Sequence, residues 1–242
     1  MKIIEVEGIV VSNTPYKESS KIINIFTSEY GIIGCISKGC KNLKSKLRLP
    51  SEKFAYGTFH LYYKENGLST LIDGDIKNYF FNIKNDIVKI SYLSYLVELA
   101  VHTYKESENN EVYNLLIDAI LKIEDNLDPR IITNILEVQY LSYLGINLNL
   151  DECVKCGSSK VVTLSMNKGG YVCANCREQE ELIDEKVLKL LRLYQYVDIS
   201  KISNLDIDEN NSKIISKIID EYYDLYSGLR TKSKKFLKEI DW

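Results

Sequence analysis

The sequence contains no apolar run of the roughly 18 residues that a membrane-spanning helix needs. Its first apolar stretch is interrupted by Glu5 and Glu7, so it predicts a strand and not a signal peptide. Without an export signal we expect a cytoplasmic protein with no membrane partner. In that compartment the six cysteines are reduced thiols or metal ligands and not disulfides.

Histidine is also scarce, since His60 and His102 are the only two and lie in different predicted domains. The chain has no His-Glu-x-x-His or Gly-x-Ser-x-Gly motif and no paired catalytic carboxylates. The machinery of hydrolytic or redox catalysis is therefore lacking. The sequence favours a binding protein over an enzyme.

The net charge is −3, but the charges are unevenly distributed. Residues 1–81 hold 11 Lys/Arg against 8 acids, a balance of +3, whereas residues 82–151 hold 5 against 11, a balance of −6. The N-terminal part is thus basic and the middle acidic. Two dense basic clusters stand out, one within residues 38–53 and one within residues 230–238.

The first 80 residues have the pattern of β-structure. Short runs rich in β-branched residues alternate with turn-like stretches such as residues 12–15 and the Asn66-Gly67 pair. The predicted strands are Ile3–Val11, Ile22–Phe26, Ile32–Ile36, Phe54–Tyr63 and Leu68–Ile76. Five strands in so short a span favour a small closed or half-closed barrel such as an OB-fold.

After residue 82 the apolar residues recur at helical spacing. One helix is well delimited, because Asp128 suits the N-cap, Pro129 the first turn and Gly145 the end. The other predicted helices cover about residues 83–100, 111–123, 184–197 and 212–237. The sequence therefore predicts an α+β protein: a five-stranded OB-fold barrel (1–80), a helical domain (81–149), an inserted metal module (150–181) and C-terminal helices (182–242) that pack with the helical domain.

The sharpest motif is formed by four cysteines. Cys153 and Cys156 are separated by two residues, as are Cys173 and Cys176, and sixteen residues lie between the pairs. Two residues between paired cysteines let both sulfurs reach one ion, and four thiolates suit tetrahedral zinc. Since the protein fills all four positions, we expect one structural zinc ion. Four unrelated thiols or an iron–sulfur cluster are the alternatives.

Two basic segments are candidate nucleic-acid contacts, because spread lysines suit a phosphate backbone. The candidates are Lys38, Lys41, Lys44, Lys46 and Arg48 in the long connection, and Arg230, Lys232, Lys234 and Lys235 near the C-terminus. The second segment also suits an acidic partner. Strand alternation places Phe54, Tyr56, His60 and Tyr62 on one face, where bases stack if that face is exposed.

Several short segments in a fixed order resemble the RecO family of bacterial recombination mediators, over nearly the whole chain. They are Gly8-Ile9-Val10-Val11, Tyr16-Lys17-Glu18, Ile25-Phe26-Thr27, Gly31-Ile32-Ile33-Gly34, Ser37-Lys38-Gly39, Lys44-Ser45, Gly67-Leu68, the two cysteine pairs, Leu229-Arg230-Thr231-Lys232-Ser233 and Phe236-Leu237. The chain departs from the family after the basic loop, where a Gln-Pro-Phe-like segment is frequent. Here Glu52 adds a negative charge that we expect to alter the DNA contacts of the loop.

The resemblance implies an N-terminal OB-fold, a helical domain and a zinc element. It also implies binding to single- and double-stranded DNA, annealing of complementary strands, and help in loading RecA onto covered strands. Its implied partners are RecR and the acidic C-terminal tail of single-stranded-DNA-binding protein. Two other hypotheses fit the residues: a protein-interaction scaffold with little DNA contact, and an RNA-binding zinc-ribbon protein.

Overall fold

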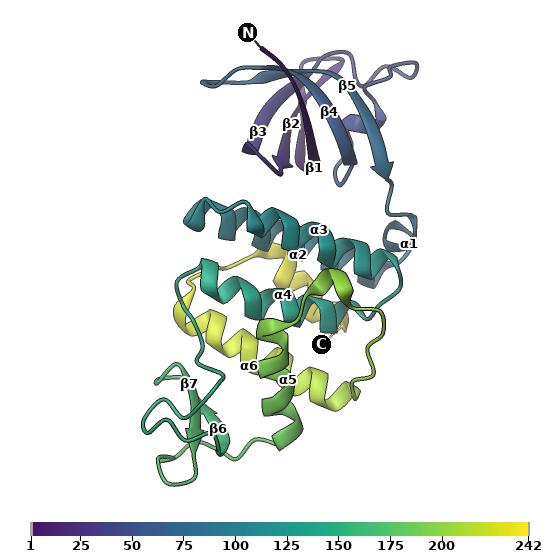
Figure 1. Cartoon of the computed structure of the whole chain (residues 1–242). Coiled ribbons are helices and arrows are strands. Elements are labelled where there is room, and N and C mark those ends of the chain that lie inside the picture. Colours follow the sequence, from purple (N-terminus) through teal and green to yellow (C-terminus); the bar gives the residue numbers. More distant parts are fainter. Residues whose placement is uncertain (1, 242) are drawn as a thin grey trace. The chain divides into compact units, whose positions relative to one another are not determined.

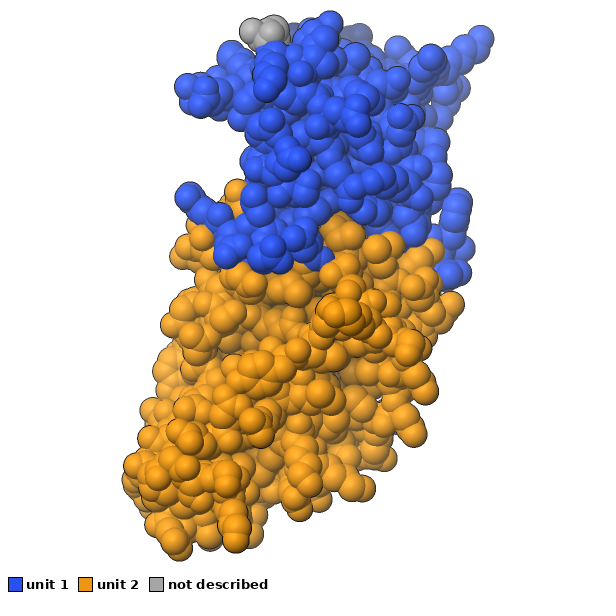
Figure 2. All heavy atoms as spheres, viewed as in Figure 1, with its two compact units in different colours: residues 1–85, 108–114 blue, residues 86–107, 115–242 orange. Residues whose placement is uncertain are grey.

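The computed structural model describes residues 2–241, which form helices and strands in two compact units (Figure 1). The first unit contains the residues up to 85 together with 108–114, and the second contains residues 86–107 and those from 115 onward (Figure 2). Among the described residues, no helix combines the length and the apolar character needed to cross a bilayer.

The first unit is built on a closed five-stranded barrel with strand order β1-β2-β3-β5-β4. Neighbouring strands pair antiparallel except β3 and β5, which are parallel, and β4 pairs back onto β1 to close the barrel. The strands are β1 (Lys2–Tyr16), β2 (Ser20–Thr27), β3 (Gly31–Ser37), β4 (Tyr56–Tyr63) and β5 (Ser69–Asn78). The predicted OB-fold and α+β class are confirmed.

Side-chain alternation fills the barrel. On β4, Phe59 and Leu61 are fully buried in the barrel core, whereas Tyr62, the residue after Leu61, is 42% exposed. The buried core cluster comprises Ile4, Val6, Val10, Ile23, Ile25, Ile33, Cys35, Ala55, Phe59, Leu61 and Leu71. Because these side chains occupy the interior, any ligand of this barrel must bind on its outside or its loops.

The first strand is longer than predicted, and the turn expected at residues 12–15 is wrong. The ladder between β1 and β2 shifts register between Val10 and Ser12, which is the signature of a β-bulge. Beyond the bulge the polar residues remain paired, and Asn24 Nδ2 donates to Ser12 Oγ at 2.8 Å. The chain turns only at Lys17, which has φ 52°.

The second unit is helical. Asp128 accepts hydrogen bonds from the backbone N–H of Arg130 at 2.8 Å and of Ile131 at 3.1 Å, so the predicted N-cap is confirmed.

The helices are α1 (Phe81–Lys84), α2 (Ile87–Ser107), α3 (Glu111–Glu124), α4 (Pro129–Tyr143), α5 (Glu185–Tyr196), α6 (Glu209–Tyr226) and α7 (Lys232–Asp241). The helix α1 and the first residues of α3 belong to the barrel unit. In the second unit, α2 packs against α4 and α7, and α4 packs against α5 and α6.

The last helical region, predicted as one element over about residues 212–237, consists of two helices. Gly228 has φ +62° directly after Ser227, the C-cap of α6, and a left-handed residue at this point ends a helix. Asp208 caps the start of α6 by accepting from two backbone N–H groups, which the sequence analysis missed. The break lets α7 turn back and pack against α2.

Candidate metal centre and nucleic-acid interface

The four cysteines lie in a small module inserted between α4 and α5, as predicted. The module contains one hairpin, β6 (Val161–Ser165) and β7 (Gly170–Cys173), whose turn contains Gly169 with φ +66° (Figure 1). Cys173 ends β7, and a tight turn after it carries Cys176. Gly157, with φ +71°, donates its N–H to the Cys153 carbonyl at 2.8 Å and closes the other turn.

The sequence-predicted ligands Cys153, Cys156, Cys173 and Cys176 come together. Their four Sγ atoms all lie within 4.8 Å of one another, and those of Cys156 and Cys173 are 3.6 Å apart. A tetrahedral ion with Zn–S bonds of about 2.3 Å holds its sulfurs about 3.8 Å apart. The cluster therefore has the dimensions that a four-thiolate zinc ion requires.

The pKa values of Cys153 and Cys176 are also compatible with a bound cation. Burial opposes ionisation of Cys153, but hydrogen bonds from the backbone at Cys173, Lys155 and Cys156 outweigh it and lower the pKa of this thiol to about 6. Hydrogen bonds with Cys156 and Cys173 raise the pKa of Cys176 to about 12. Cys176 thus resists ionising beside the other sulfurs, and a divalent cation would stabilise its thiolate form.

Few apolar side chains are buried around the four cysteines. The cluster there consists of Cys153, Cys173 and Val172, with Val154, Val161 and Cys176 packed against it, and the hairpin also buries Leu164 and Tyr171. Hydroxyl groups connect it to the helices: Tyr171 donates to the Leu188 carbonyl on α5, and Tyr226 on α6 donates to the Met166 carbonyl at 3.0 Å. A bound ion would therefore join the two cysteine turns, where few apolar side chains are buried.

The first basic cluster lies on the long connection between β3 and β4. All five predicted cations are exposed, namely Lys38, Lys41, Lys44, Lys46 and Arg48. Within residues 2–241, no acidic side chain forms an ion pair with Lys38, Lys44, Lys46 or Arg48. Glu52, the acid that departs from the family pattern, is paired with Lys21 at 2.9 Å. The positive charges of Lys38, Lys44, Lys46 and Arg48 are therefore left for an external anion.

The same connection is firmly held to the barrel. Ser51 is fully buried, and its Oγ lies 2.7 Å from Ser37 Oγ and 2.6 Å from the Leu47 carbonyl. The Leu47 side chain packs against the barrel core. Lys41 is tied to the β1–β2 turn, because its backbone N–H donates to the Ser19 carbonyl at 2.9 Å. The exposed cations thus project from an ordered scaffold.

The predicted stacking face is only partly accessible. Phe54 and Tyr56 are buried, and the ring of Tyr56 stacks on Phe80 at 6.1 Å, so neither can receive a base. Tyr62 is exposed and His60 is half-buried, which keeps these two available. Tyr16 is a further exposed aromatic, at 36%, and it ends β1 beside the β1–β2 turn. It was not among the predicted stacking residues, because the turn was expected earlier, at residues 12–15.

The second basic cluster divides into two kinds of residue. Arg230, Lys232 and Lys235 are exposed, whereas the Lys234 side chain is only 14% exposed and its ammonium lies 2.6 Å from Glu137 and 2.7 Å from Asp220. Burial disfavours this ammonium, but the two carboxylates outweigh that effect and raise the pKa of Lys234. Lys234 is thus held by two carboxylates within the fold, and its contact with DNA stays a prediction.

A pocket of about 430 Å³ adjoins the exposed members of this cluster. Its walls combine apolar Leu99 and Leu229 with the cationic Arg230, Lys232 and Lys235. Tyr95, Asp220, Tyr223, Asp224, Thr231, Lys234 and Lys238 complete the lining. Cations around an apolar floor suit an anionic ligand that also carries an apolar group.

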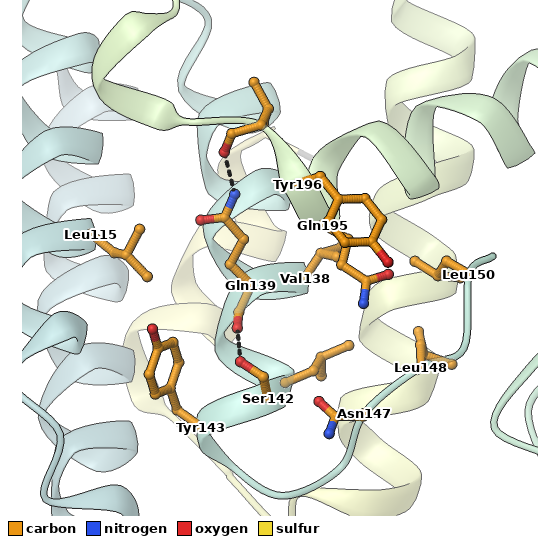
Figure 3. Close-up of a pocket in the computed structure, with 12 residues that line it drawn as sticks. Leu115, Val138, Gln139, Ser142, Tyr143, Asn147, Leu148, Leu150, Gln195 and Tyr196 are labelled. Carbon is orange, nitrogen blue, oxygen red and sulfur yellow. Dashed lines mark hydrogen bonds between the residues drawn. The ribbon is translucent and has the colours of Figure 1, made fainter.

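A different hollow, of about 330 Å³, lies among α3, α4 and the end of α5 (Figure 3). Its walls are braced by Gln139, whose Nε2 donates to the Val197 carbonyl at 2.7 Å, while Ser142 Oγ donates to the Gln139 carbonyl at 2.8 Å. The lining is made of neutral side chains only, among them Asn147 and Gln195. Without a cation this hollow does not suit a phosphate backbone.

Known proteins resemble the chain along almost its full length. Residues 1–80 match the family described as "Recombination protein O N terminal", and residues 84–235 match "Recombination protein O C terminal". The DNA repair protein RecO of Halalkalibacterium halodurans is 36% identical over 240 residues, covering 97% of this chain and 94% of that protein. RecO of Listeria monocytogenes serotype 4b is also 36% identical with the same coverage, and RecO of Bacillus pumilus is 34% identical over 99% of this chain and 95% of its own length. The chain therefore belongs to the RecO family of DNA repair proteins, which gives it a role in DNA repair and recombination.

Proposed function

We propose that this protein acts by binding DNA and not by catalysis. In this proposal it holds the phosphate backbone of single- and double-stranded DNA, anneals complementary strands, and helps to load a recombinase onto strands covered by single-stranded-DNA-binding protein. The family resemblance is one support for this proposal. The ordered loop of exposed cations at residues 38–48 supports it most directly.

The loop at residues 38–48 carries the proposal because most of its cations have no acidic partner among the described residues and its backbone is anchored to the barrel. Lys44, Lys46 and Arg48 have no acidic partner among the described residues, so binding a phosphate breaks no internal ion pair. The Ser51 and Leu47 anchors hold the loop in place, so little conformational entropy is lost on binding. Point charges on such a loop contact a backbone without reading sequence.

A charge-reversal experiment tests this interface. The variant Lys44→Glu, Lys46→Glu, Arg48→Glu should bind a single-stranded oligonucleotide at least about tenfold more weakly, since backbone contacts dominate such affinity. The matched control reverses the exposed Lys186, Lys189 and Lys217 of α5 and α6 and changes the net charge equally. If both variants bind alike, the loop is not the interface.

We further propose that the pocket beside α7 receives the acidic C-terminal tail of single-stranded-DNA-binding protein. The exposed Arg230, Lys232 and Lys235 complement a negative peptide, and Leu99 and Leu229 offer an apolar floor. Lys235→Glu should weaken binding of a labelled tail peptide, while Lys217→Glu should not. RecR is the second proposed partner, on the family resemblance alone.

The four-cysteine cluster is proposed to hold one structural zinc ion. The ion would supply four metal–sulfur bonds to two turns around which few apolar side chains are buried. Since the protein provides all four ligands, no position remains for a reacting water, and the module contributes stability instead of chemistry. About one zinc per chain in freshly purified protein is the expected metal content.

Competition between matched strands separates this function from RNA binding. A labelled DNA strand should resist displacement by the RNA strand of the same sequence. Preferential displacement by RNA would favour the RNA-binding hypothesis. Partner binding with no measurable DNA binding at low salt would favour the scaffold hypothesis.

A further inference from the structure

The four cysteines of the cluster differ in their access to solvent. Cys156 is exposed, Cys176 is intermediate, and Cys153 and Cys173 are buried. We infer that Cys156 is an oxidation site: a hydroperoxide oxidises it, Cys173 closes a disulfide with it, and the zinc ion is released. This inference rests on the zinc site proposed above.

The exposure pattern selects Cys156 over every other thiol of the chain. Outside the cluster, Cys35 is 0% exposed in the barrel core and Cys40 is 1% exposed beneath the basic loop. A peroxide must reach the sulfur it attacks, and thiolate character together with access decides which cysteine reacts. A zinc ligand is a thiolate, and only Cys156 combines that state with an exposed position.

A resolving thiol lies within reach. The Sγ atoms of Cys156 and Cys173 are 3.6 Å apart, although the two residues come from different cysteine pairs. Because each pair supplies one member, the new disulfide would join the two turns that the zinc ion otherwise joins. It would also remove one ligand from each turn and leave the ion with two.

The chemistry balances without a further reactant. The Cys156 sulfur attacks one peroxide oxygen, the O–O bond breaks, and a sulfenic acid forms while hydroxide leaves. The Cys173 thiolate then attacks the sulfenic sulfur, so the S–S bond forms and the S–O bond breaks. Two thiolates lose two electrons in total, and hydrogen peroxide takes up two protons to become two waters.

Release of the ion would have a local structural effect. The buried cluster around the cysteines is made of Cys153, Cys173 and Val172, so release of the ion would loosen the two cysteine turns and the end of the β6–β7 hairpin that carries Cys173. The hydroxyl contact between Tyr226 and the Met166 carbonyl at the other end of the hairpin would weaken. The barrel has its own core and would keep its structure.

The test uses the full chain in reduced form, with its zinc content measured first. Hydrogen peroxide is added beside a chromogenic zinc chelator, and thiol pairs are mapped by non-reducing peptide mass spectrometry. The expected result is release of about one zinc per chain, a Cys156–Cys173 disulfide, and recovery with dithiothreitol and zinc. Hydrogen exchange should quicken in β6 and β7 and stay unchanged in β1–β5.

A matched variant isolates the role of Cys156. Cys156→His retains a zinc ligand that peroxide does not oxidise to a disulfide, so it should keep zinc and release it at least about tenfold more slowly. Equal release rates in this variant and the wild type would overturn the inference. If the variant lacks zinc, the peptide map of the wild-type protein decides between the outcomes. Oxidation that begins at Cys35, Cys40 or Cys176 would contradict the inference that Cys156 reacts first.

The remaining outcomes separate the two proposals. Absence of zinc from the reduced protein refutes the metal site itself. Zinc that stays bound in excess peroxide, or cysteines that pass to sulfonic acid without a disulfide, leaves the metal site standing and overturns the oxidation site.

Discussion

The ammonium of Lys234 on α7 lies 2.6 Å from the carboxylate of Glu137 on α4, and the Glu137 side chain is 1% exposed. Asp220 on α6 completes the ion-pair network at 2.7 Å, and Tyr95 on α2 donates its hydroxyl to Glu137 at 2.5 Å. Four helices thus meet around one buried ion pair. Lys234, which the sequence analysis also proposed as a DNA contact, thus fastens the last helix to the rest of its unit.

Loss of this ammonium should be costly. Lys234→Met leaves Glu137 buried without its cation, and breaking a buried pair in this way costs about 3 to 5 kcal/mol. Equilibrium unfolding in urea measures the effect. Lys235→Met is the neighbouring control, because Lys235 is exposed, and its cost should stay within about 0.5 kcal/mol. Equal stability of the two variants would mean that the pair does not hold α7.

Stability of the helical unit should fall at alkaline pH. Burial raises the pKa of Tyr95 and of Tyr223 well above the usual 10, and the pKa of Lys234 is also raised. Above about pH 10 the unfolded chain loses these protons while the folded chain keeps them, so the free energy of unfolding decreases by roughly 1.4 kcal/mol per pH unit for each group. Thermal unfolding between about pH 9 and pH 11 measures this loss. The stability of the variant Tyr223→Phe should depend less on pH. If its pH dependence equals that of the wild type, the alkaline loss of stability comes from other groups.

Removal of one zinc ligand should leave the DNA interface intact. Cys173→Ser is expected to lower metal content and the stability of the β6–β7 module, since that module has little other core. Folded protein should still bind DNA like the wild type, because the proposed loop belongs to the barrel unit. Metal analysis and oligonucleotide titration test the two halves separately. If the folded variant lost DNA affinity together with its zinc, the module would belong to the DNA interface.

The order of the basic loop can be tested without changing its charge. Ser51→Ala removes the hydroxyl that lies 2.6 Å from the Leu47 carbonyl and 2.7 Å from Ser37 Oγ. The lost buried hydrogen bond should cost about 1 to 2 kcal/mol in unfolding free energy, and amide exchange should quicken across residues 38–50. Weaker DNA binding at unchanged charge would follow from the greater mobility. Ser45→Ala, at a half-buried position of the same loop, is the milder comparison.

The sequence predicted best the features that depend on local spacing. The Asp128 cap and the five strands of the barrel follow from patterns within a few residues, and the structure confirms them. The spacing of the two cysteine pairs likewise predicted one cluster, and their sulfurs do lie together. The bulge after Val10 was missed because it depends on the register with β2, which lies ten or more residues further along. Local pattern gave no sign that the polar residues after it would stay paired.

The role of Lys234 was missed for a similar reason. Its partner Glu137 is 97 residues away in sequence, and only the fold brings the two together. One signal was present: Glu137 interrupts the apolar face of α4, and a charged residue on a buried face needs an opposite charge. The sequence therefore indicated that Glu137 needs a cationic partner, but the identity of that partner, Lys234, follows only from the fold.

The salt dependence of single-stranded DNA binding decides whether the basic loop contacts the phosphate backbone. Each phosphate contact contributes about 0.7 to the slope of log K against log salt, so the variant Lys44→Glu, Lys46→Glu, Arg48→Glu should show a slope smaller by about 2. The control with Lys186, Lys189 and Lys217 reversed should keep the wild-type slope. A triple loop variant whose slope equals that of the wild type would contradict the account, because the loop would then carry no phosphate contacts.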